Sequence, residues 1–356
     1  MEKILLGHGS GGRLMHQLIR EYFAPKFNLK EFNDSAVVNF PTSLVHPFAN
    51  SVERQALSVN RTTLLRLAFT TDSYVVSPIF FPGGNIGDLA VNGTVNDISM
   101  VGAKPLYLSA GFIIEEGFPI NDLKVILSSM SDASQKAGVR IVAGDTKVVD
   151  KGKGDGIFIN TSGVGIIRDG VELGAKNIKA GDRVIVSGLT GSHGIAVLAE
   201  RNGLSFAPPV LSDTAPLNGL VDLMLNTSGE IRMMRDPTRG GVATTLKEIA
   251  EESGLCIIIE EDLIPVAPCV KGACELLGLD PLYIANEGIL AAVVSPDAAE
   301  PLLKEMRDYS LGKNASIIGE AISGDTKTCG MVLLKTSIGG TRIIDMLSGE
   351  QLPRIC

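Results

Sequence analysis

The chain has 356 residues, 45% of them hydrophobic, and a formal net charge of −8 with an isoelectric point near 5.2. This length suffices for two packed cores, and the acidic balance excludes a protein built to bind the nucleic-acid backbone. No apolar run approaches the roughly 20 residues of a membrane helix, and nothing resembles a signal peptide. We therefore expect a cytoplasmic protein that does not attach to membranes, with its five cysteines as free thiols.

A glycine-rich stretch near the N-terminus, Gly7-His8-Gly9-Ser10-Gly11-Gly12-Arg13, precedes a helical pattern from Leu14 to Tyr22. Glycines before a helix can turn backbone N–H groups toward a phosphate, and the helix dipole adds to the attraction. No Gly-Lys-Ser/Thr follows, so this is not a Walker A loop. By itself the stretch is better explained as a flexible linker, and a nucleotide-binding role needs support from elsewhere in the chain.

The helix expected from Ile86 to Met100 carries a carboxylate on an apolar face. The 3.6-residue period places Asp97 in line with Ala90 and Val101. An inward-facing carboxylate is costly unless it is paired or bound to an ion. Two interpretations therefore stay open, an ion ligand and a buried salt bridge.

Other aspartates occur beside apolar strands or in turns. A strand over 64–71 delivers Asp72, a short strand over 139–143 is followed by Asp145, and Asp34 lies in a turn. Carboxylates from separate loops suit Mg²⁺, which usually keeps several waters and binds phosphate oxygens as well. Because a single aspartate is most often a solvated turn residue, the prediction depends on the set.

The remaining pattern alternates strands and helices, which is typical of layered α/β domains. Elements are expected in this order: a strand over 107–114, a helix capped by Asn121 and ended by Gly138, strands over 157–167 and 184–186, helices after 191–194 and from 241 through 253, and strands over 256–260, 289–294, 317–322 and 331–334. A polar turn at 177–182 indicates a domain boundary.

The chain ends in Pro353-Arg354-Ile355-Cys356. A thiol on the last residue of a tethered segment can visit more than one site, and its thiolate, with an ordinary pKa of about 8.5, is a nucleophile. From Met346 onward an extended tail spans roughly 35 Å. A frayed terminus is the simpler explanation for these four residues alone, so the motifs upstream decide the interpretation.

Together these stretches resemble the superfamily of aminoimidazole-ribonucleotide (AIR) synthetase, thiamine-phosphate kinase and selenophosphate synthetase, and within it the HypE family of hydrogenase-maturation carbamoyl dehydratases. The motifs that carry the resemblance span nearly the whole chain: 8–12, 71–75, Phe80-Phe81-Pro82-Gly83-Gly84-Asn85-Ile86-Gly87, Gly144-Asp145-Thr146-Lys147-Val148-Val149, Thr238-Arg239-Gly240-Gly241-Val242, Ala285-Asn286-Glu287-Gly288 and 353–356. The aspartate and glycine motifs are common to the superfamily, whereas a C-terminal cysteine distinguishes this family from the kinases and synthetases.

The resemblance implies an α/β (α+β) fold of two AIR synthetase-like, or PurM-like, domains. The first domains of two subunits would form the barrel-like core of a homodimer, and the second domain would be an α/β sandwich followed by a mobile tail. The implied segments are a nucleotide-covering segment at 1–40, an ATP-binding and dimerisation domain at 41–177, a second domain at 178–335 and the tail at 336–356.

The resemblance also implies ATP and Mg²⁺ as cofactors. The residues expected to hold the nucleotide are Gly9, Ser10, Gly11, Gly12, Asp72, Asn85, Asp97, Asp145, Thr146, Lys147 and Asp236. The metal ligands would be Asp72, Asp97, Asp145 and Asp236, with Asp34 as a further candidate. Lys147 would steady the transferred phosphoryl group. Ile289 departs from the family, which tends to have a basic residue after Asn-Glu-Gly.

The implied reaction begins when a carbamoyltransferase, HypF, loads Cys356 with a carbamoyl group. ATP-dependent dehydration, with Glu287 as base, would give a thiocyanate, and its cyanide would pass to iron on a HypC–HypD scaffold for the Fe(CN)2CO centre of [NiFe]-hydrogenase. Two alternatives stay open. One is a small-molecule kinase or ligase with an inert tail, and the other is a non-catalytic carrier whose nucleotide site only sets conformation.

Overall fold

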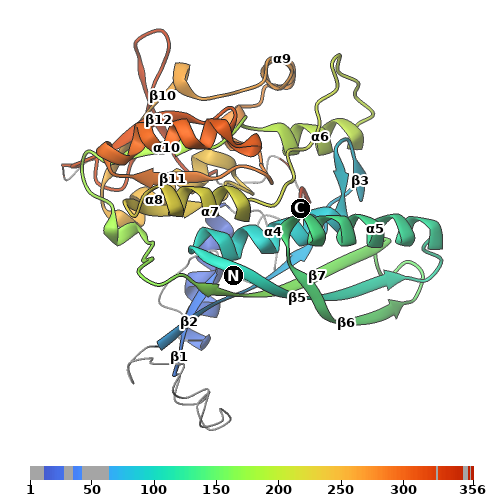
Figure 1. Ribbon diagram of the computed structural model, residues 1–356. Helices are drawn as coiled ribbons and strands as arrows, with labels where there is room; N and C mark the ends of the chain where they lie inside the picture. The colour runs from blue at the N-terminus through green and yellow to red at the C-terminus, as the bar shows by residue number, and fades with distance from the viewer. Residues whose placement is uncertain (1–11, 28–34, 42–63, 326–327, 348–351, 353) are drawn as a thin grey trace, which may run out of the picture.

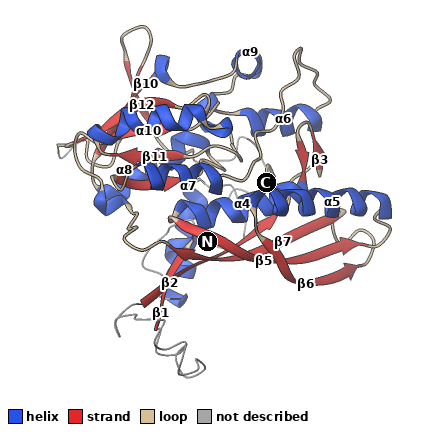
Figure 2. Cartoon of the chain, viewed as in Figure 1, coloured by secondary structure: helices blue, strands red, loops and turns tan. Residues whose placement is uncertain are grey.

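Two β-sheets with helices packed on them make up the chain (Figures 1 and 2). The computed structural model describes residues 12–27, 35–41, 64–325, 328–347, 352 and 354–356. The predicted α/β (α+β) fold in two parts is confirmed. Within the described residues the first sheet is open and forms no closed barrel.

The first sheet has five strands, and its helices cover one face. Its strand order is β1 (Ala36–Pro41), β2 (Leu64–Tyr74), β7 (Ile157–Ile167), β5 (Ala103–Glu115) and β6 (Arg140–Val149). Neighbouring strands are antiparallel except for the parallel pair of β5 and β6. The helices on this sheet are α4 (Ile86–Met100) and α5 (Ile120–Ala137), with a small hairpin of β3 (Phe80–Phe81) and β4 (Gly84–Asn85). The N-terminal helical segment, α1 (Arg13–Leu18), a π-helical turn η2 (Ile19–Phe23) and α2 (Ala24–Phe27), contacts the second half instead, where Arg13 pairs with Asp345 and His16 with Glu248.

Helix α4 is buried along nearly its whole length because it packs between the first sheet and the second half of the chain (Figure 1). A capping box begins it: the Asn85 side chain accepts from the N–H of Gly87, and Asp88 accepts from the N–H of Asn85. Its small residues allow close approach, since a Cβ on Gly93 would lie 2.2 Å from the hydroxyl of Tyr74. The extent predicted for this helix, 86–100, is confirmed.

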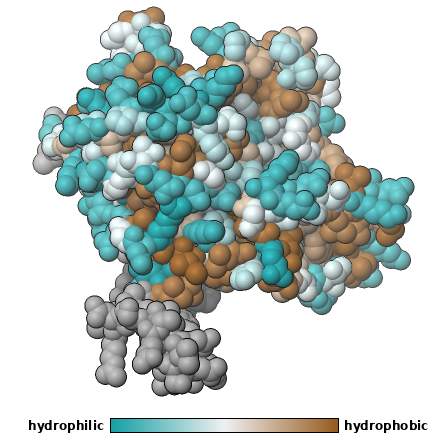
Figure 3. Space-filling view, in the orientation of Figure 1, coloured by the Kyte–Doolittle hydropathy of each residue, from teal (hydrophilic) through white to brown (hydrophobic). Residues whose placement is uncertain are grey.

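The opposite face of the first sheet exposes large apolar side chains. The strand register places Val38, Phe69, Tyr107 and Ile113 on this face, whereas the exposed Val37, Ile141 and Val148 pair with residues of the helix-covered face. Figure 3 shows hydrophobic atoms gathered on the half of the molecule that holds this sheet. An exposed apolar face of this extent is unusual for a monomer and is typical of an interaction surface.

The second sheet has seven strands and is covered on both faces. Its order is β14 (Thr341–Ile344), β13 (Val332–Lys335), β10 (Cys256–Glu260), β12 (Ser316–Ile322), β8 (Arg183–Val186), β11 (Ala291–Val294) and β9 (Ile231–Arg235). One core lies under α8 (Gly241–Ser253), and another lies under α7 (Asn218–Thr227) and α10 (Pro296–Asp308). A smaller cluster joins α6 (Ser192–Arg201) and α9 (Pro268–Leu277).

Several sequence predictions need correction. Asp72 and Asp145 do not follow their strands but lie inside β2 and β6, which extend further than their apolar runs. Helix α5 begins at Ile120 with Pro119 as its N-cap, so the predicted Asn121 cap is wrong, whereas the end at Gly138, with φ of 68°, is confirmed. Strand β6 is a solvent-exposed edge strand although its sequence is apolar.

Among the described residues, no helix combines the length and the hydropathy needed to cross a bilayer.

Candidate active site

The C-terminal residues dock between the two halves, beside the end of β2 (Figure 1). The N–H of Val75 donates to the Cys356 carbonyl at 3.1 Å, and the N–H of Ser77 donates to the Arg354 carbonyl at 3.2 Å. Arg354 Nε donates to the Val75 carbonyl at 2.9 Å, and its guanidinium also pairs with Asp155. The tail thus adds a short strand-like segment to the residues after β2.

Helix α6 holds the tail from the second half. His193 Nε2 lies 2.8 Å from the Ile355 carbonyl, and Arg201 donates to the carbonyls of Arg354, at 2.8 Å, and Ser77, at 2.7 Å. Because a carbonyl can only accept, the hydrogen of the imidazole must be on Nε2. Burial lowers the pKa of His193 to about 4, so the ring is neutral at physiological pH.

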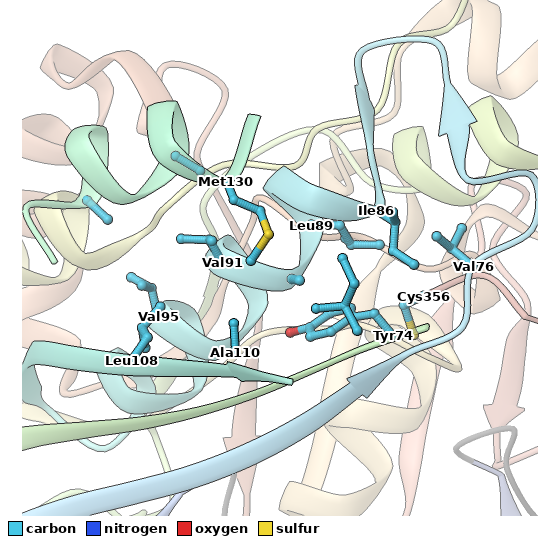
Figure 4. Packing of buried hydrophobic residues seen from close by; sticks show 14 of the residues in the cluster. Tyr74, Val76, Ile86, Leu89, Val91, Val95, Leu108, Ala110, Met130 and Cys356 are labelled. Carbon is cyan, nitrogen blue, oxygen red and sulfur yellow. The ribbon is translucent and has the colours of Figure 1, made fainter. Parts of the chain in front are cut away.

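The Cys356 side chain is buried in the same hydrophobic cluster as Tyr74 and Val76 (Figure 4). Its sulfur lies 2.9 Å from Nε of Arg239. Burial raises the pKa of the thiol to about 12, and the charges of Glu287 and Asp72 act in the same direction, while the Arg239 charge lowers it. The docked cysteine is therefore a neutral thiol.

Arg239 comes from the loop that precedes α8, and the acidic groups around it, first Cys356 and then Asp72 and Glu287, raise its pKa, so the guanidinium stays charged. The next residue, Gly240, has φ of 79°, and a Cβ there would lie 2.2 Å from Oγ1 of Thr244. Only glycine fits this turn, so the glycine fixes the direction in which Arg239 leaves the backbone. The motif Thr238-Arg239-Gly240 was recognised in the sequence, but Arg239 was not among the predicted site residues.

Glu287 lies in the turn before β11 and is only 3% exposed. Its neighbour Asn286 fixes that turn, because the Asn286 side chain accepts from the N–H of Gly191 at 2.6 Å and donates to the Pro237 carbonyl at 2.9 Å. Among the described residues, Oε1 of Glu287 has no hydrogen-bond partner. A buried carboxylate oxygen without a partner is costly, which points to a ligand or a reacting group as its partner.

Burial is the largest cause that raises the pKa of Glu287 well above its ordinary value. The charges of Asp236, Asp213 and Asp72 raise it further, and Arg239 lowers it. A carboxylate with an increased proton affinity, close to the docked sulfur, is suited to accept protons from a group carried on that sulfur.

Three predicted metal ligands gather near this cluster. Asp72 is half-buried at the end of β2, Asp236 is buried beside Glu287, and Asp97 accepts from Oγ1 of Thr70 at 2.8 Å. In the described part of the chain, no group of three metal-binding side chains is already assembled. Separate carboxylates of this kind fit Mg²⁺ held partly by phosphate oxygens and water.

Other predicted site residues lie elsewhere. Asp145, Thr146 and Lys147 are exposed on β6, where Lys147 Nζ pairs with the Asp145 carboxylate at 2.7 Å and lowers the pKa of Asp145. The strand order places β6 three strands from β2, about 14 Å from Asp72 at ordinary strand spacing. Within one chain these residues are not brought to Cys356.

Asn85 caps α4, and its side chain also donates to Ser129 Oγ at 2.6 Å, so its polar atoms have partners in the fold. Gly12 is the N-cap of α1. The predicted positions Gly9, Ser10, Gly11 and Asp34 lie outside the described residues.

Comparison with known proteins places the chain in a family. Residues 55–167 match the N-terminal domain of AIR synthase related proteins, and residues 179–331 match the C-terminal domain. The carbamoyl dehydratase HypE of Bradyrhizobium diazoefficiens is 52% identical over 99% of this chain and 95% of that protein. The chain belongs to the HypE family. HypE of Escherichia coli is 42% identical over the full length of both chains.

Solved structures of the HypE family have the same fold. A HypE–HypF complex matches with a TM-score of 0.81 at 46% identity, covering 93% of this chain and 99% of that one. HypE in complex with ATP matches with a TM-score of 0.79 at 43% identity, covering 99% and 100%. A thiamine-phosphate kinase structure, AaThiL with AMPPCP and TMP, has a TM-score of 0.61 over 94% and 96% at 16% identity, which shows the shared fold alone.

The HypE family assignment confirms the resemblance inferred from the sequence motifs. Residues that the motif analysis did not single out are Arg239, His193 and Asp213. Asp213 is in a loop without a motif, and His193 stands in a helix-start pattern that predicts only the helix.

Proposed function

We propose that this protein is an ATP-dependent carbamoyl dehydratase whose substrate is carried on its own C-terminal cysteine. The single observation that carries the proposal is the docked position of Cys356, buried beside Arg239 and close to the buried Glu287, whose Oε1 lacks a hydrogen-bond partner among the described residues. An inert tail has no need of a prepared polar site for its last atom. Family membership supports the same activity.

In the proposed reaction an S-carboxamide on Cys356 becomes a thiocyanate. The amide oxygen leaves as an oxygen of the phosphate and the amide nitrogen loses two protons, so the group on Cys356 loses the elements of water while ATP becomes ADP and phosphate. When bound, MgATP supplies the phosphoryl group that converts the amide oxygen into a good leaving group. Asp72, Asp97 and Asp236 would hold the magnesium and the phosphates.

The chain's own residues orient the reacting group and move its protons. Arg239 holds the sulfur and supplies positive charge beside it. Glu287, with its raised pKa and free oxygen, takes the amide protons. Burial of Cys356 excludes water, which would otherwise hydrolyse the activated carbamoyl group.

Loading of Cys356 must occur with the tail released, because the docked sulfur is enclosed. A HypF-like carbamoyltransferase would load it, as the solved HypE–HypF complex suggests, and a HypC–HypD-like scaffold would receive the cyanide. In this scheme the part of residues 336–356 that follows β14 acts as the moving tail, because β14 is paired in the second sheet, and the part of residues 1–40 that precedes β1 covers the nucleotide.

We further propose that two copies associate through the exposed apolar face of the first sheet. Lys147 and Asp145 lie on β6 at the edge of this sheet. A role for Lys147 on the phosphoryl group therefore requires the nucleotide or a second subunit to bridge between that edge and the docked tail. Residues 41–177 would be the dimerisation domain, and residues 178–335 would be the second domain.

Intact mass spectrometry tests the activity. The protein is incubated with the carbamoyltransferase HypF, carbamoyl phosphate and MgATP. Wild type should gain roughly 25 Da on its C-terminal peptide, whereas Glu287→Ala should stall roughly 18 Da higher, one water short of dehydration. Cys329→Ala, which removes an exposed thiol, is the matched control and should behave as wild type. An unmodified Cys356 would favour a small-molecule kinase or ligase with an inert tail.

A further inference from the structure

Two consecutive residues, Ser212 and Asp213, contact His193, which holds the docked tail, and the turn that carries Glu287. The Ser212 hydroxyl lies 2.8 Å from Nδ1 of His193, whose Nε2 donates to the Ile355 carbonyl. Because Nε2 carries the imidazole hydrogen, Nδ1 must accept from the Ser212 hydroxyl. Ser212 thus selects the tautomer of His193 that can bind the docked tail.

Asp213 holds the turn that carries Glu287. Its Oδ2 accepts from the N–H of Glu287 at 3.1 Å and from the N–H of Gly288 at 2.9 Å. The backbone N–H of His193 also stabilises the ionised form of Asp213. The fit is close, since a Cβ on Gly288 would lie 1.7 Å from the Asp213 carbonyl oxygen.

The segment is itself anchored on the first half of the chain. The N–H of Ser212 donates to the Pro82 carbonyl at 2.8 Å. Asn96 of α4 donates to the carbonyls of Ala215, at 3.1 Å, and Glu287, at 3.4 Å. With these anchors, a shift of residues 212–213 must move both the His193 ring and the Glu287 turn.

We infer that Ser212 and Asp213 are positioning residues that couple tail docking to the placement of Glu287, so that the base is aligned only around a docked tail. This inference rests on the proposed dehydratase function. In the described part of the chain neither side chain hydrogen-bonds to the Cys356 sulfur, and both act through other residues: Ser212 through His193, and Asp213 through the backbone of residues 287–288.

Coupling of this kind would protect the reaction. A base aligned without a docked substrate has nothing to deprotonate. A docked carbamoyl group without an aligned base would be activated by ATP and then hydrolysed before dehydration. A short rigid segment that contacts both groups links the two arrangements through direct hydrogen bonds.

The test uses two readouts on the full-length protein, and both are measured on the peptide released by cleavage after Glu350. Tail docking is measured as the alkylation rate of the unloaded Cys356 with iodoacetamide. For the chemical step, Cys356 is first loaded with potassium cyanate, which adds HNCO to the thiol and gives the S-carboxamide without a partner protein or ATP. MgATP is then added, and dehydration is measured as the single-turnover loss of roughly 18 Da.

Ser212→Ala should raise alkylation about 10-fold, the effect of one hydrogen bond, and should slow dehydration by a similar factor. Asp213→Ala should slow dehydration about 100-fold through misplacement of the base, and should raise alkylation as well. The double variant should be no worse than Asp213→Ala, because residues that act as one unit are not additive.

Ser212→Thr keeps the hydroxyl, and Asp213→Asn keeps an acceptor oxygen. In both variants the rates of alkylation and dehydration should stay within about 3-fold of wild type. Ser316→Ala, which removes a partly exposed hydroxyl that donates to the Leu263 carbonyl, is the matched control. Coupling is wrong if Asp213→Ala leaves alkylation at the wild-type rate and the double variant shows the product of the single effects. If loaded wild type loses no water, the dehydratase proposal fails, while alkylation still reports whether Ser212 and Asp213 hold the tail.

Discussion

The sulfur of Cys356 lies 2.9 Å from Nε of Arg239, across 117 residues of sequence. Two effects act on that sulfur in opposite directions. Burial disfavours the thiolate and the neighbouring guanidinium favours it, and burial has the larger effect because the pKa of the docked thiol is about 12. The docked state is thus suited to hold a neutral, loaded sulfur, and the nucleophilic thiolate belongs to the released tail.

Tail docking should weaken as pH rises. The pKa of Cys356 is raised from 9.0 in the free thiol to about 12 when docked. The stabilisation of the docked tail is therefore complete below pH 9 and is lost progressively as pH rises toward 12. Alkylation of Cys356 between pH 7 and 10 should increase more steeply than alkylation of the exposed Cys329, measured in the same sample. Parallel profiles for the two thiols would contradict a docked neutral thiol.

Arg239→Gln should slow dehydration about 100-fold, since it removes the charged donor that holds the sulfur. Loading by the carbamoyltransferase should change by less than about 2-fold, because the released tail does not contact Arg239 and the interaction is made only on docking. Intact mass distinguishes the two steps: loading is seen as the appearance of the S-carboxamide, and dehydration is seen as its later loss of water. Arg342→Gln, at an exposed pair with Asp280, is the control. Equal losses in both steps would argue against a role confined to the docked state.

Glu287→Gln should abolish dehydration and yet stabilise the fold. The pKa of Glu287 is raised above 4.5, so its contribution to stability is complete below pH 4.5 and is lost as pH rises through the folded-state pKa. At pH 8 the variant should melt about 2–4 °C above wild type, and the difference should shrink toward pH 5. Thermal melts across this range check it. A variant less stable than wild type at pH 8 would mean that the carboxylate is satisfied by a partner.

Asp72→Asn and Asp236→Asn should each weaken MgATP binding by about 10-fold or more, since each removes a charge from the proposed magnesium site. In isothermal titration calorimetry, removing Mg²⁺ with EDTA should weaken ATP binding to wild type by a factor similar to that caused by each substitution. Asp169→Asn, at an exposed turn, should bind as wild type. Affinity for MgATP that is insensitive to both substitutions would place the metal elsewhere.

Phe69→Glu should shift the protein toward monomer if two copies meet through the first sheet. Phe69 is 51% exposed and contributes to the apolar face together with Tyr107 and Ile113. A buried charge at such an interface is costly without a partner. Light scattering after size exclusion measures the change. Leu276→Glu on α9, at 76% exposure, is the control, and its mass should equal that of wild type.

Local patterns in the sequence predicted many of the elements. The helix at 86–100 and the strands at 157–167 and 256–260 have the predicted extents, because each has a clear period and a definite start or stop signal. Strand β9 and helices α7 and α10 were not predicted. Asp72 and Asp145 follow similar apolar runs, but only Asp72 reaches the tail, because the order of strands in the sheet is set by long-range pairing.

The sequence by itself determined the family, through its glycine and aspartate motifs and the terminal cysteine, and it determined the residue types available for the chemistry. Only the tertiary structure decided that Arg239 contacts the sulfur, that Glu287 is buried and that residues 212–213 join the tail to the Glu287 turn. The contacts of the docked tail and of the Glu287 turn join residues 74 to 162 positions apart in the sequence. The physical reason is that a local pattern shows which face of an element is buried, whereas the partner on that face depends on how the whole chain packs.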